Sequence, residues 1–227
     1  MTAWNTITGP KQECREAFIS GIRDHIARPT DFFVLPSEDA HDAHLIKEEW
    51  PRSRIRGVEK EKAIWSVIDA DHLHVDTWHM DIAEYVRRET ADKPTRVFDA
   101  SFLDYTGWMS EGNLHDVASF AARLSKPKFI LAVTFQKSVR RERDRVRDSV
   151  LNHSCLEDND LRAVEDEDTG EWNNSLYIAD AVCGAIERRM PQQLSRLEIL
   201  HHRQYRAKAS TAEMFFATIL IERFEPI

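Results

Sequence analysis

Acidic residues follow or end several short apolar runs in this chain, in particular Glu59, Asp81, Asp99 and Asp104. An ionised carboxylate accepts two hydrogen bonds at once, so it can hold a pair of hydroxyl groups or an amine. Each residue also has a structural explanation. Glu59 begins a charged turn, Asp81 can cap the helix that follows it, and the other two can end a strand. The sequence alone supports both interpretations.

Aromatic and basic residues come next along the chain. Tyr105 and Trp108 closely follow Asp104 and could stack on a planar ligand, or pack their loop against the next helix. Residues 137–147 include six basic side chains among eleven, with Arg140 and Arg141 in the middle. This segment could contact phosphates, although two interleaved acids also fit a solvated, salt-bridged helix.

The sequence lacks the motifs of several other enzyme classes. The chain has no G-x-S-x-G elbow for a serine hydrolase and no P-loop for nucleotide hydrolysis. Its three cysteines form no C-x-x-C pair and its ten histidines form no H-E-x-x-H motif, so we expect no disulfide framework and no metal site. The formal net charge of −8 restricts any contact with nucleic acid to a local patch.

The composition indicates a folded chain with one core. Hydrophobic residues make up 42% of the 227 residues and charged residues 31%, and we expect a single domain over residues 1–227. No apolar run approaches the roughly 20 residues that span a bilayer, and the N-terminus has no hydrophobic stretch after a basic start. We therefore expect a cytoplasmic protein without a membrane partner.

Short apolar runs alternate with amphipathic segments up to residue 136, which implies βαβ crossovers and a mainly parallel sheet between two helical layers. Two further strands near the C-terminus should pair as a hairpin. In the sequence between residue 136 and these two strands, we expect a charged helix over 138–151 and an acidic loop or insertion at about 155–172. Strands are expected at 31–36, 54–59, 72–78, 96–104, 128–135, 196–205 and 213–224, and other helices at 9–27, 38–50, 60–70, 80–90, 113–124 and 174–190.

This order of elements resembles the class I S-adenosylmethionine-dependent methyltransferase fold over nearly the whole chain. The resemblance implies an α/β three-layer sandwich whose seven-stranded, mostly parallel sheet has the order 3-2-1-4-5-7-6 and ends in an antiparallel hairpin. In open α/β sheets, ligands bind beyond the carboxyl ends of the strands, near the switch in strand order.

The resemblance also assigns a cofactor site for S-adenosylmethionine. Glu59 would receive the ribose hydroxyls, Asp81 would lie near the adenine amine, and the loop that begins with Leu35, Pro36 and Ser37 would face the methionine part. Members of the family usually have a glycine-rich loop at that point, which lets the backbone approach the cofactor. This chain has no glycine between residues 21 and 57.

The stretch from Phe98 to Gly107 reads as F-D-x-x-x-L-D-x-x-G and looks like the fourth-strand motif of some nucleic-acid methyltransferases. That reading places Asp104 beside the acceptor amine. A rival alignment places residues 99–102 on the [DNS]-P-P-[YFW] motif of amino-methyltransferases and makes Asp99 the polar residue, although both prolines are missing here.

The resemblance thus implies methyl transfer to a nitrogen of a nucleic acid, RNA or DNA. Asp104 or Asp99 would orient the acceptor, Tyr105 and Trp108 would stack on it, and Arg140 with Arg141 would bind its phosphates. The alternative is a non-catalytic methyltransferase-like scaffold or binding protein that has lost the cofactor. The glycine-free first loop is the feature that favours this alternative.

Overall fold

The computed structural model describes residues 9–36, 40–70, 75–91, 97–136, 152, 175–206 and 213–224. The expected helix over 138–151 and the acidic loop at about 155–172 lie outside these residues. None of the helices in the described ranges is long and apolar enough to cross a membrane. The helices are α1 (Pro10–His25), α2 (His41–Glu49), α3 (Lys62–Ala70), α4 (Ile82–Glu89), α5 (Glu111–Leu124) and α8 (Ser175–Arg189). The strands are β1 (Asp31–Val34), β2 (Arg54–Glu59), β3 (Val75–His79), β4 (Phe98–Trp108), β5 (Ser125–Gln136), β6 (Leu194–Arg206) and β7 (Glu213–Arg223).

The strands form one seven-stranded sheet in the order β3-β2-β1-β4-β5-β7-β6. Strands β1 to β5 pair in parallel with one another. Strand β7 inserts antiparallel between β5 and β6, as the second strand of the C-terminal hairpin. The predicted fold class and strand order are confirmed.

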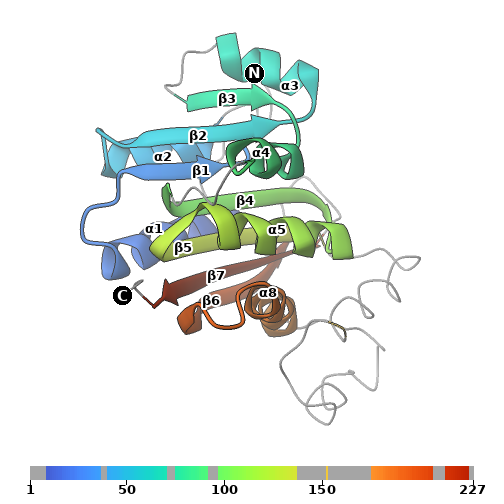
Figure 1. The fold of residues 1–227 in the computed structure, drawn as a ribbon. Coiled ribbons are helices and arrows are strands. Elements are labelled where there is room, and N and C mark those ends of the chain that lie inside the picture. The colour runs from blue at the N-terminus through green and yellow to red at the C-terminus, as the bar shows by residue number, and fades with distance from the viewer. Residues whose placement is uncertain are drawn as a thin grey trace.

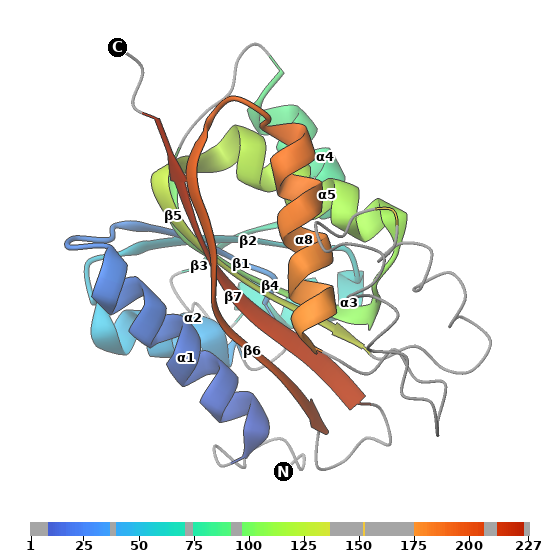
Figure 2. The ribbon, with the colours of Figure 1, turned by 90° about the horizontal axis from the view of Figure 1, so that it is seen from below.

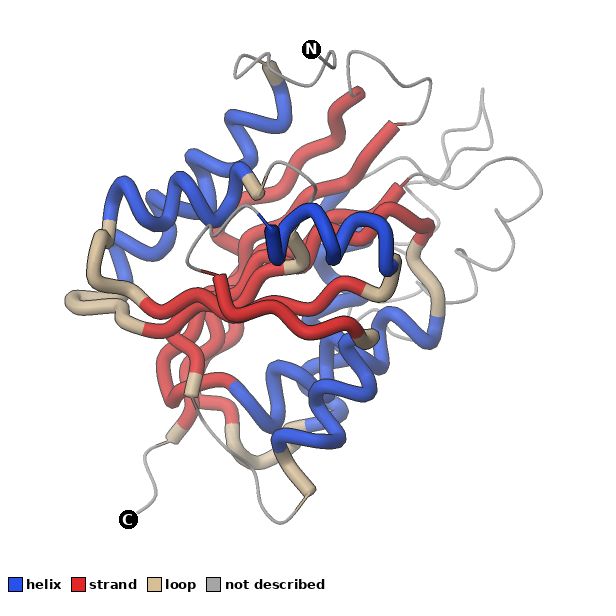
Figure 3. The backbone as a smooth tube through the Cα atoms, turned by 90° about the horizontal axis from the view of Figure 1, so that it is seen from above, coloured by secondary structure: helices blue, strands red, loops and turns tan. Residues whose placement is uncertain are grey.

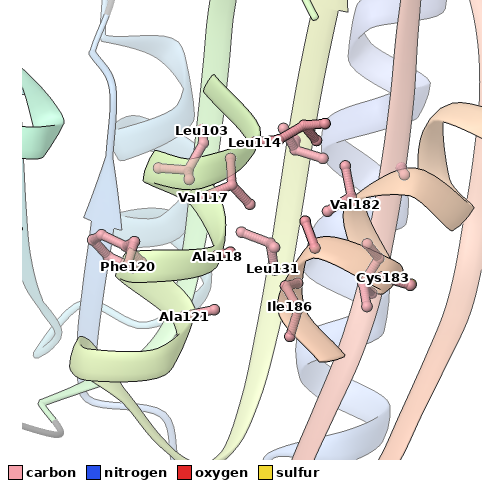
Figure 4. Packing of buried hydrophobic residues seen from close by; sticks show 14 of the residues in the cluster. Leu103, Leu114, Val117, Ala118, Phe120, Ala121, Leu131, Val182, Cys183 and Ile186 are labelled. Carbon is pink, nitrogen blue, oxygen red and sulfur yellow. The ribbon is translucent and has the colours of Figure 1, made fainter. Parts of the chain in front are cut away.

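Helices cover both faces of the sheet (Figure 1, Figure 3). Helices α1 and α2 lie on one face, whereas α4, α5 and α8 lie on the other (Figure 2). Successive side chains of a strand point to opposite faces, so Phe32 and Val34 of β1 pack with α1 and α2 while Phe33 packs with the opposite layer. In that layer, Val117 of α5 and Leu131 of β5 belong to the core where α5 and α8 meet (Figure 4).

The two central strands β4 and β5 are longer than the sequence indicates. Lys126 and Pro127 are expected to precede β5, but they lie inside it. The pairing of β4 with β5 shifts register between Phe98 and Ala100, and the irregularity accommodates a proline, which cannot donate to a ladder. A second shift, between Asp104 and Trp108, lies at the carboxyl end of β4.

The carboxyl ends of β1 to β5 meet at one edge of the sheet, because these strands are parallel. The strand order switches between β1 and β4, where β2 lies on one side of β1 and β4 on the other. Open α/β sheets bind their ligands at such a switch. We call this the ligand edge.

Candidate functional site at the ligand edge

The chain stays hydrogen-bonded to β4 just beyond the end of β1. The amide of Leu35 donates to the carbonyl of Phe102 in β4 at 3.1 Å. Strand β2 approaches this segment so closely that a Cβ on Gly57 would lie 2.7 Å from the Val34 carbonyl oxygen and 3.0 Å from Cδ of Pro36. Glycine is therefore required in β2 opposite this segment, and it allows Pro36 to be buried over the strand.

The first loop ends at Ala40, which has φ 42° and ψ 33° and precedes α2. This left-handed conformation costs a residue with a Cβ about 1 to 2 kcal/mol and is normally taken by glycine. Ala40 is also fully buried. The backbone at this point thus has a conformation that favours glycine, although the residue is alanine. Ser37 lies outside the described residues.

Carboxylates follow the ends of β2 and β3, as predicted. Glu59 is half-buried, and its Oε1 accepts the backbone N–H of Glu61 at 2.6 Å. Asp81 is exposed and caps α4, with Oδ1 accepting the N–H of Glu84 at 2.7 Å. The capping interpretation of Asp81 is confirmed. Each carboxylate has a second oxygen with no hydrogen bond to the described residues, so either can still bind a ligand.

Asp104 lies near the end of β4 and its side chain is only 11% exposed. Its Oδ2 accepts a hydrogen bond from the Lys11 ammonium of α1 at 2.6 Å. Its Oδ1 accepts a hydrogen bond from the hydroxyl of Thr134, the residue opposite it in β5. Asp104 thus has a fixed orientation at the ligand edge, on the face covered by α1.

A second buried ion pair lies beside the first. Nε of Arg15, one turn after Lys11 on α1, donates to Oδ1 of Asp42 in the first turn of α2 at 2.6 Å. Burial and the nearby charge of Asp104 raise the pKa of Asp42, and Arg15 opposes this shift. Burial disfavours the charged form of Lys11, but Asp104 and Asp42 outweigh it and raise the pKa of its ammonium. The two ion pairs, Lys11 with Asp104 and Arg15 with Asp42, therefore form one cluster of interacting charges.

Tyr105 does not lie with Asp104. Adjacent residues of a strand face opposite sides, and Tyr105 stacks on Phe135 in the other layer, with ring centroids 5.2 Å apart and planes inclined by 12°. Its hydroxyl is buried without a hydrogen-bond partner among the described residues, and burial raises the pKa of the phenol. Trp108 ends β4 opposite Gln136, but its side chain is outside the described part, as are Arg140 and Arg141.

Asp99 lies at the opposite end of β4, away from the ligand edge. Its Oδ2 accepts the backbone amides of Thr30 at 2.8 Å and Asp31 at 3.0 Å, and Lys126 Nζ lies 2.7 Å away. These bonds join β1, β4 and β5 at their amino ends. The alignment that made Asp99 the acceptor residue is therefore not supported by its position.

Lys11, Arg15, Asp42 and Thr134 belong to the site but were not singled out from the sequence. A signal exists for two of them, because Lys11 and Arg15 continue the spacing of Phe18 and Ile22 and so lie on the buried face of α1. The described residues contain no group of three or more His, Cys, Asp or Glu side chains that could hold a metal ion.

Comparisons with known proteins give structural matches only. No protein-family model matches the sequence. No curated protein matches it either. Among solved structures, the plantazolicin methyltransferase BpumL in complex with S-adenosylhomocysteine has a TM-score of 0.53 at 10% identity, covering 92% of this chain and 83% of its own.

Two further structures agree with this match. A protein from Klebsiella pneumoniae assigned as an O-methyltransferase has a TM-score of 0.54 at 12% identity and covers 96% of this chain and 83% of its own. The cofactor-bound Rv0187 from MTB has a TM-score of 0.51 at 14% identity, with coverages of 96% and 84%. Together with the strand order and the antiparallel β7, these matches show that the chain has the class I S-adenosylmethionine-dependent methyltransferase fold.

Proposed function

We propose that this protein transfers a methyl group from S-adenosylmethionine to a nitrogen atom of a nucleic acid. The observation that carries the proposal is the position of Asp104, a nearly buried carboxylate fixed at the ligand edge of a methyltransferase fold. The carboxylates that follow β2 and β3 support the cofactor part of the proposal.

The residues at the ligand edge fit this cofactor. Glu59 would accept the ribose hydroxyls with its second oxygen, and Asp81 would accept the adenine amine. The loop from Leu35 and Pro36 through Ser37 to Ala40 would face the methionine part, and the left-handed backbone of Ala40 makes the turn there without glycine. When bound, the cofactor supplies a methyl group activated by its sulfonium.

Asp104 can accept further hydrogen bonds. A carboxylate has about four acceptor positions, and Lys11 and Thr134 use two of them. An N–H group of the substrate can therefore donate to Asp104 without displacing either partner. This bond orients the nitrogen lone pair toward the methyl group and holds the proton that the nitrogen loses, and such positioning is the main contribution an enzyme makes to this transfer.

The nucleic-acid part of the proposal depends on the basic segment after β5. This strand ends at the ligand edge with Gln136, and the six basic residues of 137–147 begin there. Arg140 and Arg141 would contact phosphates near the acceptor. Trp108, paired with Gln136 at the same edge, is the remaining candidate for stacking on the acceptor base, because Tyr105 packs in the opposite layer.

Calorimetric titration with S-adenosylmethionine and S-adenosylhomocysteine tests the cofactor site. We expect micromolar binding that weakens about tenfold or more in Glu59→Ala, since hydrogen bonds to a charged group contribute about 1.5 to 3 kcal/mol each. Glu61→Ala is the matched control, because it removes a neighbouring carboxylate but keeps the amide that donates to Glu59.

Transfer of labelled methyl groups to total RNA, to DNA and to protein tests the acceptor. We expect label in nuclease-sensitive material, and we expect Asp104→Ala to abolish the transfer while cofactor binding persists. Label that resists nucleases but not proteases would overturn the nucleic-acid assignment.

A non-catalytic scaffold is the second candidate function. The glycine-free first loop, with Ala40 in the conformation of a glycine, favours it. Absence of binding heat for both ligands at millimolar concentration would reject the enzyme and support this alternative.

A further inference from the structure

Helices α4, α5 and α8 lie on the face of the sheet opposite α1 (Figure 2). A groove lies between these three helices. Its volume is about 240 Å³. Each of the three helices contributes an arginine to its lining, namely Arg87, Arg123 and Arg189. Val86 adds an apolar surface and Ser119 a hydroxyl.

The three arginines form no ion pair with the described residues. Arg123 is the most fixed of them, since its Nη1 donates to Oγ1 of Thr90 at 2.9 Å. Thr90 is itself buried, and its hydroxyl donates to the Val86 carbonyl at 2.6 Å. This chain of two hydrogen bonds holds one guanidinium nitrogen of Arg123 in place.

Ser119 is an independent sign of a ligand. The side chain lines the groove, the residue is 7% exposed, and its buried Oγ has no hydrogen-bond partner among the described residues. A buried hydroxyl without a partner costs about 1 to 3 kcal/mol. The described residues leave this group without a partner. Because the oxygen itself has almost no exposed surface, Ser119 must turn its hydroxyl toward the groove to donate to a ligand there.

Helix ends explain only part of this arrangement. Arg87, Arg123 and Arg189 lie in the last turns of their helices, where positive charge complements the helix dipole. Arg88 and Arg188 lie in the same turns and would serve the dipole equally well, yet they do not line the groove. The helix dipole therefore does not explain why three arginines and the unpartnered Ser119 hydroxyl line one groove.

We propose that this groove binds a small phosphate monoester, with its phosphate on the three arginines and the Ser119 hydroxyl and its organic part on Val86. Guanidinium groups pair with phosphate in a bidentate geometry, and a dianion with three terminal oxygens matches three arginines better than a carboxylate does. The volume is below the roughly 300 Å³ at which pockets for drug-sized ligands begin, so the ligand is small. Asp116 also lines the groove, and burial raises the pKa of its carboxyl; the three arginines must outweigh its negative charge to hold an anion.

Calorimetry with phenyl phosphate and inorganic phosphate tests the proposal on the full chain. We expect phenyl phosphate to bind with a Kd of about 1 mM or below, and more tightly than inorganic phosphate because its ring contacts the apolar surface. Arg123→Gln and Arg189→Gln should each weaken binding about tenfold. Arg88→Gln and Arg188→Gln are the controls, because these residues lie in the last turns of α4 and α8 but outside the groove. They should leave the affinity for phenyl phosphate unchanged.

Ser119→Ala separates a binding role from a structural one. It should weaken phenyl phosphate binding without lowering the free energy of unfolding, because the hydroxyl has no partner among the described residues of the fold. The proposal is overturned by absence of saturable binding up to about 10 mM, or by equal losses in the groove and control variants. Tighter binding of a 5′-phosphorylated pentanucleotide than of phenyl phosphate would assign the groove to a nucleic-acid end instead of a small monoester.

Discussion

Lys11 and Asp104 are 93 positions apart in the sequence, and their side chains form a 2.6 Å ion pair at the ligand edge. The pair ties α1 to the end of β4, and the neighbouring pair of Arg15 with Asp42 ties the same helix to α2. The first helix of the chain is therefore part of the candidate site. Any acceptor that reaches Asp104 must bind beside the Lys11 ammonium.

A double-mutant cycle of Lys11→Met and Asp104→Asn measures the coupling energy between these two side chains. We expect a coupling energy of about 1 to 2 kcal/mol, which is less than for a fully buried pair because the Lys11 side chain is 37% exposed. Urea denaturation of the four proteins gives the value. The matched control is the exposed pair of Arg23 with Glu49, which also joins α1 to α2 and should show a smaller coupling. Equal coupling in the two cycles would contradict a special role for burial at Asp104.

Gly57→Ala tests the close approach of β2 to the segment after β1. The new Cβ would lie 2.7 Å from the Val34 carbonyl oxygen, so one of the two strands must shift. We expect a loss of about 1 to 3 kcal/mol in the free energy of unfolding. Gly107→Ala is the control, because its Cβ would meet nothing within 4 Å, and it should change stability by no more than about 0.5 kcal/mol. A similar loss in both variants would show that the contact with Val34 is not responsible, because the change in chain entropy from glycine to alanine acts in the stabilising direction.

The fold could be predicted because its signals are local. Strand β2 lies at residues 54–59 as expected, and α5 and α8 differ from their predicted bounds by one or two residues. Continuous apolar runs and helical spacing report on neighbouring residues only, and the parallel order follows from their alternation. The early start of β5 is not predicted because Pro127 signals a break that a register shift accommodates.

The site was harder to predict because it depends on register and on distant contacts. Asp99 and Asp104 have similar sequence surroundings, but only the pairing of β4 with β1 and β5 shows that they lie at opposite edges. Tyr105 follows Asp104 directly and for that reason points to the other face. Lys11 reaches Asp104 through the packing of α1 on the sheet, which no local pattern encodes.

The carboxylate of Asp31 makes stability depend on pH at the amino edge of the sheet. Burial opposes its ionisation, but the Thr30 hydroxyl, Lys126 and Arg54 outweigh burial and lower its pKa. A lowered pKa in the folded state stabilises the protein above the unfolded pKa of about 3.9, and this contribution is lost as the pH falls through the folded value. Asp31→Asn should therefore be less stable than the wild type near neutral pH, and the difference should shrink below about pH 4.

Urea denaturation of both proteins across this pH range provides the measurement. Asp24→Asn, which removes an exposed carboxylate of α1, is the control and should cost less stability near neutral pH than Asp31→Asn. A deficit of Asp31→Asn that stays constant down to the lowest pH would mean that shape and hydrogen bonding, and not charge, make Asp31 important.

Ala40 and Ala43 test the strain in the first loop, because both are buried alanines near the start of α2 but only Ala40 has a positive φ. Glycine at position 40 relieves about 1 to 2 kcal/mol of strain and costs about 0.5 to 1 kcal/mol in chain entropy, so Ala40→Gly should be neutral or slightly stabilising. Ala43→Gly relieves no backbone strain, because Ala43 has no positive φ, and should destabilise the helix by about 1 kcal/mol. Thermal unfolding of the two variants gives the comparison. Equal destabilisation would show that the left-handed turn at Ala40 carries no strain, and the first loop would then not be a replacement for a glycine-containing one.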